Sequence, residues 1–107
     1  MSFKIAGTGS YVPERVVTND ELSKYVDTSD EWIKQRIGIS ERHISTNETA
    51  GEMGYRASLS ALESAGCDAA ELDLIIGATV SGEDVSPSVS CTVQHMLGKN
   101  CMAFDIN

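Results

Sequence analysis

Two short apolar runs, separated by a predicted helix, constrain the fold of this chain more than any other feature. Residues 74–79 form a continuous apolar run, typical of a strand covered on both faces, and residues 101–106 form a second strand. Between them, Ser86–Pro87 predicts a helix start with proline in the first helical position, and this helix should reach Leu97. A strand, a helical crossover and a second strand favour parallel pairing and an α/β layered fold.

The first half of the chain is predicted to begin with a short buried strand over 3–8 and to continue with three helices. Each helix start shows a Thr followed three residues later by Glu, the pattern of a capping box. The pairs are Thr18 with Glu21, Thr28 with Glu31, and Thr49 with Glu52. The second helix should end at Gly38 and the third at Gly66. Residues 39–44 between them are expected to be extended.

The glycines Gly7 and Gly9 resemble part of a dinucleotide-binding fingerprint. That motif needs a third glycine near Val12 and a helix directly after it, whereas Pro13 and the β-branched pair Val16–Val17 keep the chain extended. The sequence therefore disfavours a dinucleotide site. No linker or internal repeat marks a second domain, so one compact unit is expected.

Charge and cysteine content exclude several classes of protein. Eight Lys and Arg against sixteen Asp and Glu give a net charge of −8, which disfavours a basic face for nucleic acid or anionic membrane. No segment approaches the ~20 apolar residues of a membrane span, and we expect a cytoplasmic protein. The cysteines are odd in number and lack paired spacing, which disfavours disulfides and a zinc site and favours reduced, mostly buried thiols. They are Cys67, Cys91 and Cys101.

The cysteines and histidines lack the sequence setting of catalytic groups. A nucleophilic thiolate needs a helix N-terminus or a nearby base, whereas Cys91 is expected within a helix and Cys101 at the start of a strand. His43 falls in an extended segment with neighbouring arginine, and His95 falls on a helix without an acid or nucleophile at matching spacing. A structural or surface role is favoured for both histidines.

Trp32 and Arg36 lie four residues apart on the second predicted helix and therefore share one face. Ile33 and Ile37 share the adjoining face and can turn toward the core. An indole offers a stacking surface and a guanidinium offers a fork for phosphate oxygens, a combination that suits a nucleotide thioester. Spacing alone nevertheless favours the simpler interpretation of a core tryptophan and a solvated arginine.

Several segments closely resemble the opening of the third-type β-ketoacyl-acyl carrier protein synthases. They are residues 7–13, 18–19, 27–33, 36–39 and 41–44, followed by 87–88, Gln94, 97–98 and 103–106. The most specific is the run from Asp27 to Trp32 with Arg36 four residues later. The resemblance covers essentially the whole chain. It implies an α/β, thiolase-like layered fold in which residues 1–107 form a truncated N-terminal half-domain, most of the first of two related halves.

The resemblance also implies an acyltransferase activity. Members of this family transfer an acyl group from coenzyme A to a cysteine and condense it with malonyl-acyl carrier protein, with loss of CO₂ and no cofactor or metal. The family's catalytic Cys, His and Asn are absent from residues 1–107, so this chain alone is expected to be inactive. The implied partners are acyl-coenzyme A, malonyl-acyl carrier protein, the remainder of the same enzyme and a second copy in a homodimer.

The resemblance assigns roles to four residues. Trp32 would stack on the adenine of coenzyme A, Arg36 would contact its phosphates and Thr28 would lie close to the base, which reverses the preference for a core tryptophan. Ser86 stands where the family often has a bulky Phe that reaches across the dimer, so the acyl pocket would be longer or wider. A compatible, simpler interpretation is that Ser86 caps the helix ahead of Pro87.

Two further functions stay open on the sequence. One is a noncatalytic assembly fragment that needs a partner chain, which the missing nucleophile and the uncovered last strand favour. The other is a related thiolase-fold acyltransferase of secondary metabolism with a different acyl donor or acceptor. The shared face of Trp32 and Arg36 favours a condensing enzyme instead.

Overall fold

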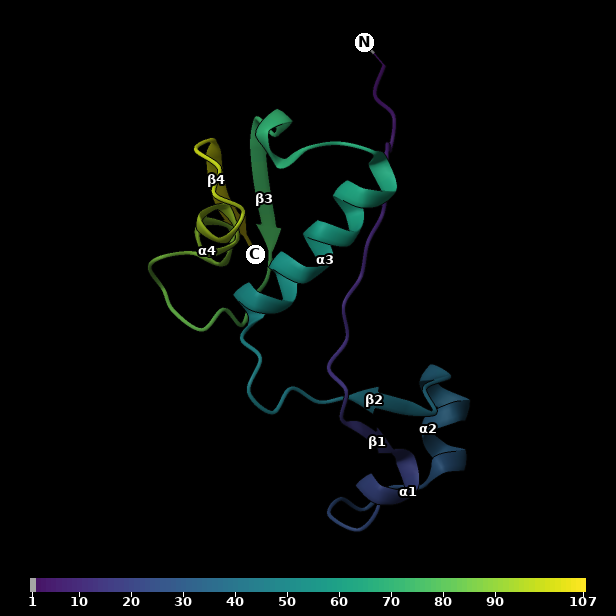
Figure 1. Cartoon of the computed structure of the whole chain (residues 1–107). Helices are drawn as coiled ribbons and strands as arrows, with labels where there is room; N and C mark the ends of the chain where they lie inside the picture. The colour runs from purple at the N-terminus through teal and green to yellow at the C-terminus, as the bar shows by residue number, and fades with distance from the viewer. Residues whose placement is uncertain (1) are drawn as a thin grey trace. The chain divides into compact units, whose positions relative to one another are not determined.

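The computed structural model describes residues 2–107, which form two compact units (Figure 1). The smaller unit is Val12–Asn47, and the larger unit combines the segment up to Tyr11 with Glu48–Asn107. This division differs from the single unit expected from the sequence. The physical reason is that each unit has buried apolar side chains of its own. They are Val17 and Ile33 in the smaller unit and Val93 in the larger one.

The smaller unit holds two short strands and two helices. In chain order they are β1 (Val16–Thr18), α1 (Asn19–Leu22), α2 (Asp30–Ile37) and β2 (Glu41–His43). The strands β1 and β2 pair antiparallel, with Val17 opposite Arg42. The prediction of an extended segment over 39–44 is confirmed at its centre, and the edge pairing with β1 explains why it is extended.

The predicted helix caps are confirmed at two of the three starts. Thr18 accepts a hydrogen bond from the backbone N–H of Glu21 at α1, and Thr49 forms a reciprocal capping box with Glu52 at α3 (Ala50–Ala65). At α2 the prediction is wrong by one residue. Ser29, not Thr28, is the cap, because Ser29 is the last residue with extended backbone before the helix and its hydroxyl accepts from the N–H of Trp32 at 3.2 Å.

Two of the predicted helix stops are confirmed. Gly38 ends α2 with φ 74°, and Gly66 ends α3 with φ 62°. Both lie in the left-handed region, which a residue without Cβ enters at no steric cost.

The larger unit contains a two-stranded parallel sheet. After α3 come the short 3₁₀ helix η1 (Ala69–Glu71), β3 (Leu74–Ala78), α4 (Val89–Met96) and β4 (Met102–Ile106). The register places Leu74 opposite Met102 and Ile76 opposite Phe104. Helix α4 packs on both strands and on α3. The predicted strand, helical crossover and parallel strand are therefore confirmed.

The start of α4 differs from the prediction. Ser88 caps this helix and accepts from the N–H of Cys91 at 3.3 Å, whereas Ser86 and Pro87 lie upstream in an exposed segment and are joined by a cis peptide bond. The prediction that Ser86 caps the helix is wrong. The first turn is fixed from β4 instead, because the carboxylate of Asp105 accepts from the N–H groups of Val89 and Ser90 at 2.9 and 2.8 Å.

The predicted strand over residues 3–8 is not observed. Within residues 2–107 this segment pairs with no strand, and its Phe3 and Ile5 side chains are exposed. It runs extended beside α3 (Figure 1). A Cβ on Gly7 would lie 2.6 Å from the backbone nitrogen of Ala65, and a Cβ on Gly9 would overlap the backbone of Ala61. These glycines therefore permit close packing of backbone on helix.

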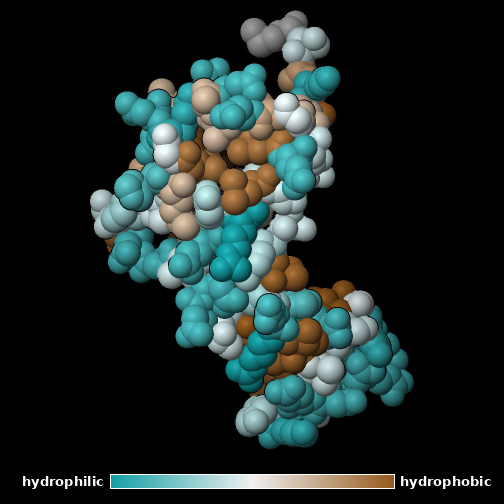
Figure 2. All heavy atoms as spheres, viewed as in Figure 1, coloured by the Kyte–Doolittle hydropathy of each residue, from teal (hydrophilic) through white to brown (hydrophobic). Residues whose placement is uncertain are grey.

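One face of the β3–β4 sheet is exposed. Side chains alternate along both strands, and the outward ones include Ile76 at 52%, Met102 at 67% and Phe104 at 41% exposure. Apolar residues reach the surface in each of the two units, as the space-filling view shows (Figure 2). The expectation that the last strand lacks cover is confirmed for this face, since α4 packs on the strands from the other side.

The cysteines differ from the prediction in their burial. All three are free thiols and half-buried, not mostly buried. The sequence could not show this, because the elements that carry them are only partly covered. Among residues 2–107 no helix is long and apolar enough to cross a membrane. The same residues contain no group of three or more His, Cys, Asp or Glu side chains that could hold a metal ion.

Candidate functional site

The first turn of α2 carries a shallow hollow of about 280 Å³. It is lined by Asp27, Thr28, Ser29 and Trp32. The hydroxyl of Ser29 holds the N–H of Trp32, so the indole is displayed at a capped and therefore well-defined helix end. Trp32 is 55% exposed, which excludes the core tryptophan that spacing alone favours.

The guanidinium of Arg36 lies over the indole of Trp32. Its central carbon Cζ is 5.4 Å from the ring centroid, within the range of a cation–π interaction. Both side chains are exposed, and the prediction that they share one helix face is confirmed. A flat aromatic ring and a fork of N–H donors are thus presented side by side at the surface.

The two isoleucines of α2 have different environments. Ile33 is 5% exposed and anchors the helix to the smaller unit, whereas Ile37 is 64% exposed. The prediction that both can face the core is wrong for Ile37. The physical reason is that α2 ends there, since the next residue, Gly38, already has left-handed backbone.

Thr28 supplies a buried hydroxyl to the wall of the hollow. Its Oγ1 is shielded from solvent and has no hydrogen-bond partner among the described residues. Leaving a buried hydroxyl unpaired costs about 1–3 kcal/mol, so such groups are exceptions in folded proteins. Thr28 was expected to be a helix cap as well as a site residue, and the structure retains only its place in the hollow.

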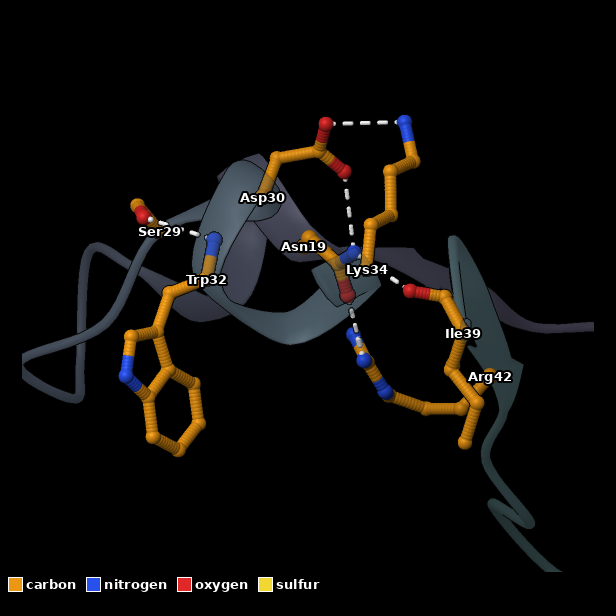
Figure 3. Close-up of polar contacts among 7 residues, drawn as sticks. All are labelled: Asn19, Ser29, Asp30, Trp32, Lys34, Ile39 and Arg42. Carbon is orange, nitrogen blue, oxygen red and sulfur yellow. Dashed lines mark hydrogen bonds and ion pairs between the residues drawn. The ribbon is translucent and has the colours of Figure 1, made fainter. Parts of the chain in front are cut away.

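A buried polar network braces α2 from behind (Figure 3). Asn19 is only 1% exposed, and its Nδ2 donates to Asp30 Oδ1 at 2.9 Å and to the carbonyl of Ile39 at 2.7 Å. Its Oδ1 accepts from Arg42 at 2.5 Å. Asn19 is not among the site residues predicted from the sequence. The available signal is its position directly after the capping Thr18, where a side chain that turns inward can reach α2.

Asp30 carries the negative charge in this network. Its pKa is lowered, first by the hydrogen bond from Lys34, whose Nζ lies 2.8 Å from Oδ2, and then by the hydrogen bond from Asn19. Figure 3 shows the indole of Trp32 directed away from these contacts. The network and the hollow therefore occupy different sides of α2.

The remaining candidates do not line the hollow at α2. Ser86 belongs to the larger unit, in the exposed segment between β3 and α4. His43 donates from Nδ1 to the carbonyl of Pro13 at 2.5 Å, which confirms a structural role, and His95 is exposed near the end of α4.

Solved structures define the class of fold. The crystal structure of 3-oxoacyl-acyl carrier protein synthase III from Aquifex aeolicus matches with a TM-score of 0.91 and 50% identity, over 96% of this chain and 34% of that one. The priming β-ketosynthase of the R1128 polyketide pathway matches with a TM-score of 0.88 and 40% identity, over 96% and 31%. The chain thus has the thiolase-like α/β fold expected from the sequence.

Curated relatives narrow the similarity to enzymes of one name. The chain is 53% identical over 107 residues to β-ketoacyl-acyl carrier protein synthase III of Clostridium acetobutylicum, covering 99% of this chain and 33% of the relative. It is 55% identical over 108 residues to the enzyme of the same name from Citrobacter koseri, covering 99% and 34%. No protein-family model matches the chain.

The resemblance to the third-type ketoacyl synthases is therefore confirmed, in sequence and in fold, for their N-terminal part. The chain spans about a third of the length of the curated relatives that it matches.

Proposed function

We propose that this chain provides the coenzyme A-facing part of a condensing enzyme. The complete enzyme would join an acyl-coenzyme A primer to malonyl-acyl carrier protein by decarboxylative condensation and so initiate fatty acid synthesis. It would act as an acyltransferase, as a homodimer, and without a cofactor. The observation that carries the proposal is the exposed pair of Trp32 and Arg36 beside the hollow at Thr28.

The chemistry of this face fits the nucleotide end of coenzyme A. The open indole of Trp32 would stack on adenine, and base stacking on an aromatic platform contributes about 1–3 kcal/mol. The guanidinium of Arg36, held near the ring, would donate to phosphate oxygens. Thr28 would pair its free hydroxyl with the base after a small side-chain rotation. The chain carries a net charge of −8, so this local cation would matter for an anionic ligand.

Affinity measurements on the complete enzyme test this proposal. Trp32→Ala should weaken binding of the thioester by about 1–3 kcal/mol. Arg36→Ala should cost about 1.5–3 kcal/mol, and its effect should shrink at high salt because the contact is ionic. Gln35→Ala is the matched control, since Gln35 is an exposed residue of α2 whose side chain, among residues 2–107, hydrogen-bonds only to Glu31. Unchanged affinity in both site variants, with the fold intact, would refute the proposal.

A second candidate is a priming condensing enzyme of a polyketide pathway. The likeness to the R1128 priming β-ketosynthase favours it. Primer range separates the two candidates, and Ser86 is the residue that we propose for the wall of the acyl pocket. A small side chain there would leave the pocket open to longer or branched acyl groups.

Ser86→Phe tests the pocket assignment. It should narrow the primers of the complete enzyme toward acetyl, measured as kcat/KM for short and long acyl-coenzyme A. Strict acetyl preference in the parent enzyme would show that another residue closes the pocket.

A further inference from the structure

Asn19 joins the two ends of α2. One N–H of its amide reaches Asp30, the first residue of the helix, and the other reaches the carbonyl of Ile39, two residues beyond the last. The backbone N–H of Asn19 donates to the carbonyl of Ser40 at 3.2 Å. A single buried side chain therefore spans the helix that carries Trp32 and Arg36.

The neighbours of Asn19 fix the orientation of its amide. Arg42 is purely a donor, so it must face Oδ1, and the carbonyl of Ile39 is purely an acceptor, so it must face Nδ2. Arg42 is itself held by the carbonyl of Val17 at 3.2 Å. Both N–H groups and the oxygen of the amide are paired, in a site that is 1% exposed. A carboxylate in the same place would lose both donors.

Apolar packing alone gives α2 little support. The helix has eight residues, well below the length at which an isolated helix is stable in water. Ile33 is its one buried residue, and one anchor leaves rotation about the helix axis poorly defined. The contacts of Asn19 at both ends supply the missing restraint.

We propose that Asn19 is a positioning residue for the coenzyme A face. By fixing both ends of α2, it sets the direction in which Trp32 and Arg36 project, without touching the ligand itself. This inference rests on the proposed function, because it assumes that the nucleotide binds at this face.

The isosteric substitution Asn19→Asp is the most informative variant. It preserves size and the acceptor for Arg42, but it places a carboxylate oxygen against Asp30 and against the carbonyl of Ile39. Val17→Ala is the matched control, because Val17 is a buried core residue of the same unit and its side chain takes no part in the network. Thermal melts give the loss of stability for both variants.

Two readouts separate positioning from stability. The first is the dissociation constant for coenzyme A in the complete enzyme, at a temperature where every variant is folded. The second is the emission of Trp32 in the 107-residue chain, of which it is the single tryptophan. Asn19→Asp should weaken coenzyme A binding by about tenfold or more, a change of ~1.4 kcal/mol, and should shift the emission. Val17→Ala should change neither the affinity for coenzyme A nor the emission of Trp32, even if it lowers the stability by the same amount.

Rescue provides a third test. Adding Asp30→Asn to Asn19→Asp offers an amide N–H to the new carboxylate, so the double variant should regain part of the lost affinity. If Asn19→Asp fails to fold, Asp30→Ala and Lys34→Ala replace it. Asp30→Ala removes the contact with Asn19, whereas Lys34→Ala removes only the ion pair and should leave the affinity unchanged.

The possible outcomes are distinct. Equal effects of Asn19→Asp and Val17→Ala on affinity, or an unchanged affinity in Asn19→Asp, would overturn the positioning role. If Trp32→Ala and Arg36→Ala leave the affinity unchanged, the proposed function fails. In that case the Trp32 emission decides the positioning role alone, and an unshifted spectrum in Asn19→Asp overturns it.

Discussion

The two units of this chain hold their elements together by different means. The smaller unit, Val12–Asn47, is braced by a fully paired buried amide at Asn19. The larger unit depends on close backbone approach at Gly7 and Gly9 and leaves an apolar strand face open. Exposed apolar side chains in the two units therefore call for different interpretations. The exposed ring on the braced helix is the recognition surface that we propose, whereas alternate exposed residues along a strand are typical of a packing surface.

The largest effect is expected from Gly9→Ala in the larger unit. The added Cβ would overlap backbone atoms of α3, which cannot move aside as a flexible side chain can. We expect a loss of about 3 kcal/mol or more in the free energy of unfolding, the upper range for overpacking. Urea denaturation gives this value directly.

Gly38→Ala in the smaller unit is the comparison for Gly9→Ala. No atom lies near its added Cβ, so the cost is only that of a left-handed conformation, about 1–2 kcal/mol. Equal losses for the two variants would show that the N-terminal segment does not depend on close contact with α3.

The next-largest effect concerns self-association of the chain, which the exposed apolar face of β3 and β4 should promote. Phe104→Lys places a charge on that face, so it should weaken self-association by about tenfold, equivalent to ~1.4 kcal/mol. Tyr25→Lys is the control, because Tyr25 is an exposed aromatic of the smaller unit that lies on no strand. Sedimentation velocity over a concentration series measures both. The same response in the two variants would mean that hydrophobicity in general, and not the strand face, drives association.

The smallest expected effect is that of salt concentration on the pKa values of two carboxylates, Asp30 and Asp105. Hydrogen bonds from Ser90, first from its side chain and then from its backbone, lower the pKa of Asp105, whereas a bond from the charged Lys34 is the main cause that lowers the pKa of Asp30. Salt screens a charged partner but not a neutral one. The pKa of Asp30 should therefore rise with salt, while that of Asp105 should stay low.

The sign of the pH dependence is the same for both groups. A folded-state pKa below the unfolded value of about 3.8 means that the ionised carboxylate stabilises its unit above that pH. That stability is lost as the pH falls through the lowered folded-state pKa. Titration of the carboxyl carbons by NMR at low and high salt measures both values. A salt response at Asp105 equal to that at Asp30 would contradict this account.

Local sequence signals predicted much of the fold. The cap at Thr18, the capping box at Thr49, the stops at Gly38 and Gly66, and the crossover between 74–79 and 101–106 all depend on neighbouring residues. The predictions that were wrong concern features that depend on residues far away in the sequence. Ser88 starts α4 because Asp105, sixteen positions from Val89, holds the first turn. Residues 3–8 form no strand because none of the strands described over 2–107 pairs with them.

The candidate site could be predicted only in part, for the same reason. Spacing places Trp32 and Arg36 on one face, but it cannot tell an exposed face from a buried one. Asn19 was missed because its role depends on contacts with Ile39 and Arg42, which lie 20 and 23 residues away. Its position directly after the capping Thr18 allows the side chain to turn inward, but the partners that bury it lie far away in the sequence.

The most direct test of the central claim is a titration of the ¹⁵N-labelled 107-residue chain with coenzyme A, followed by NMR chemical shifts. We expect saturable changes at the indole N–H of Trp32, at the guanidinium of Arg36 and at the backbone N–H of Thr28. The exposed indole of Trp32 should show the largest change, because a stacked adenine ring current acts on it directly. The β3–β4 strands should remain unaffected. Absence of saturable shifts at all three residues, or shifts confined to the strands, would contradict the assignment of a coenzyme A face to α2.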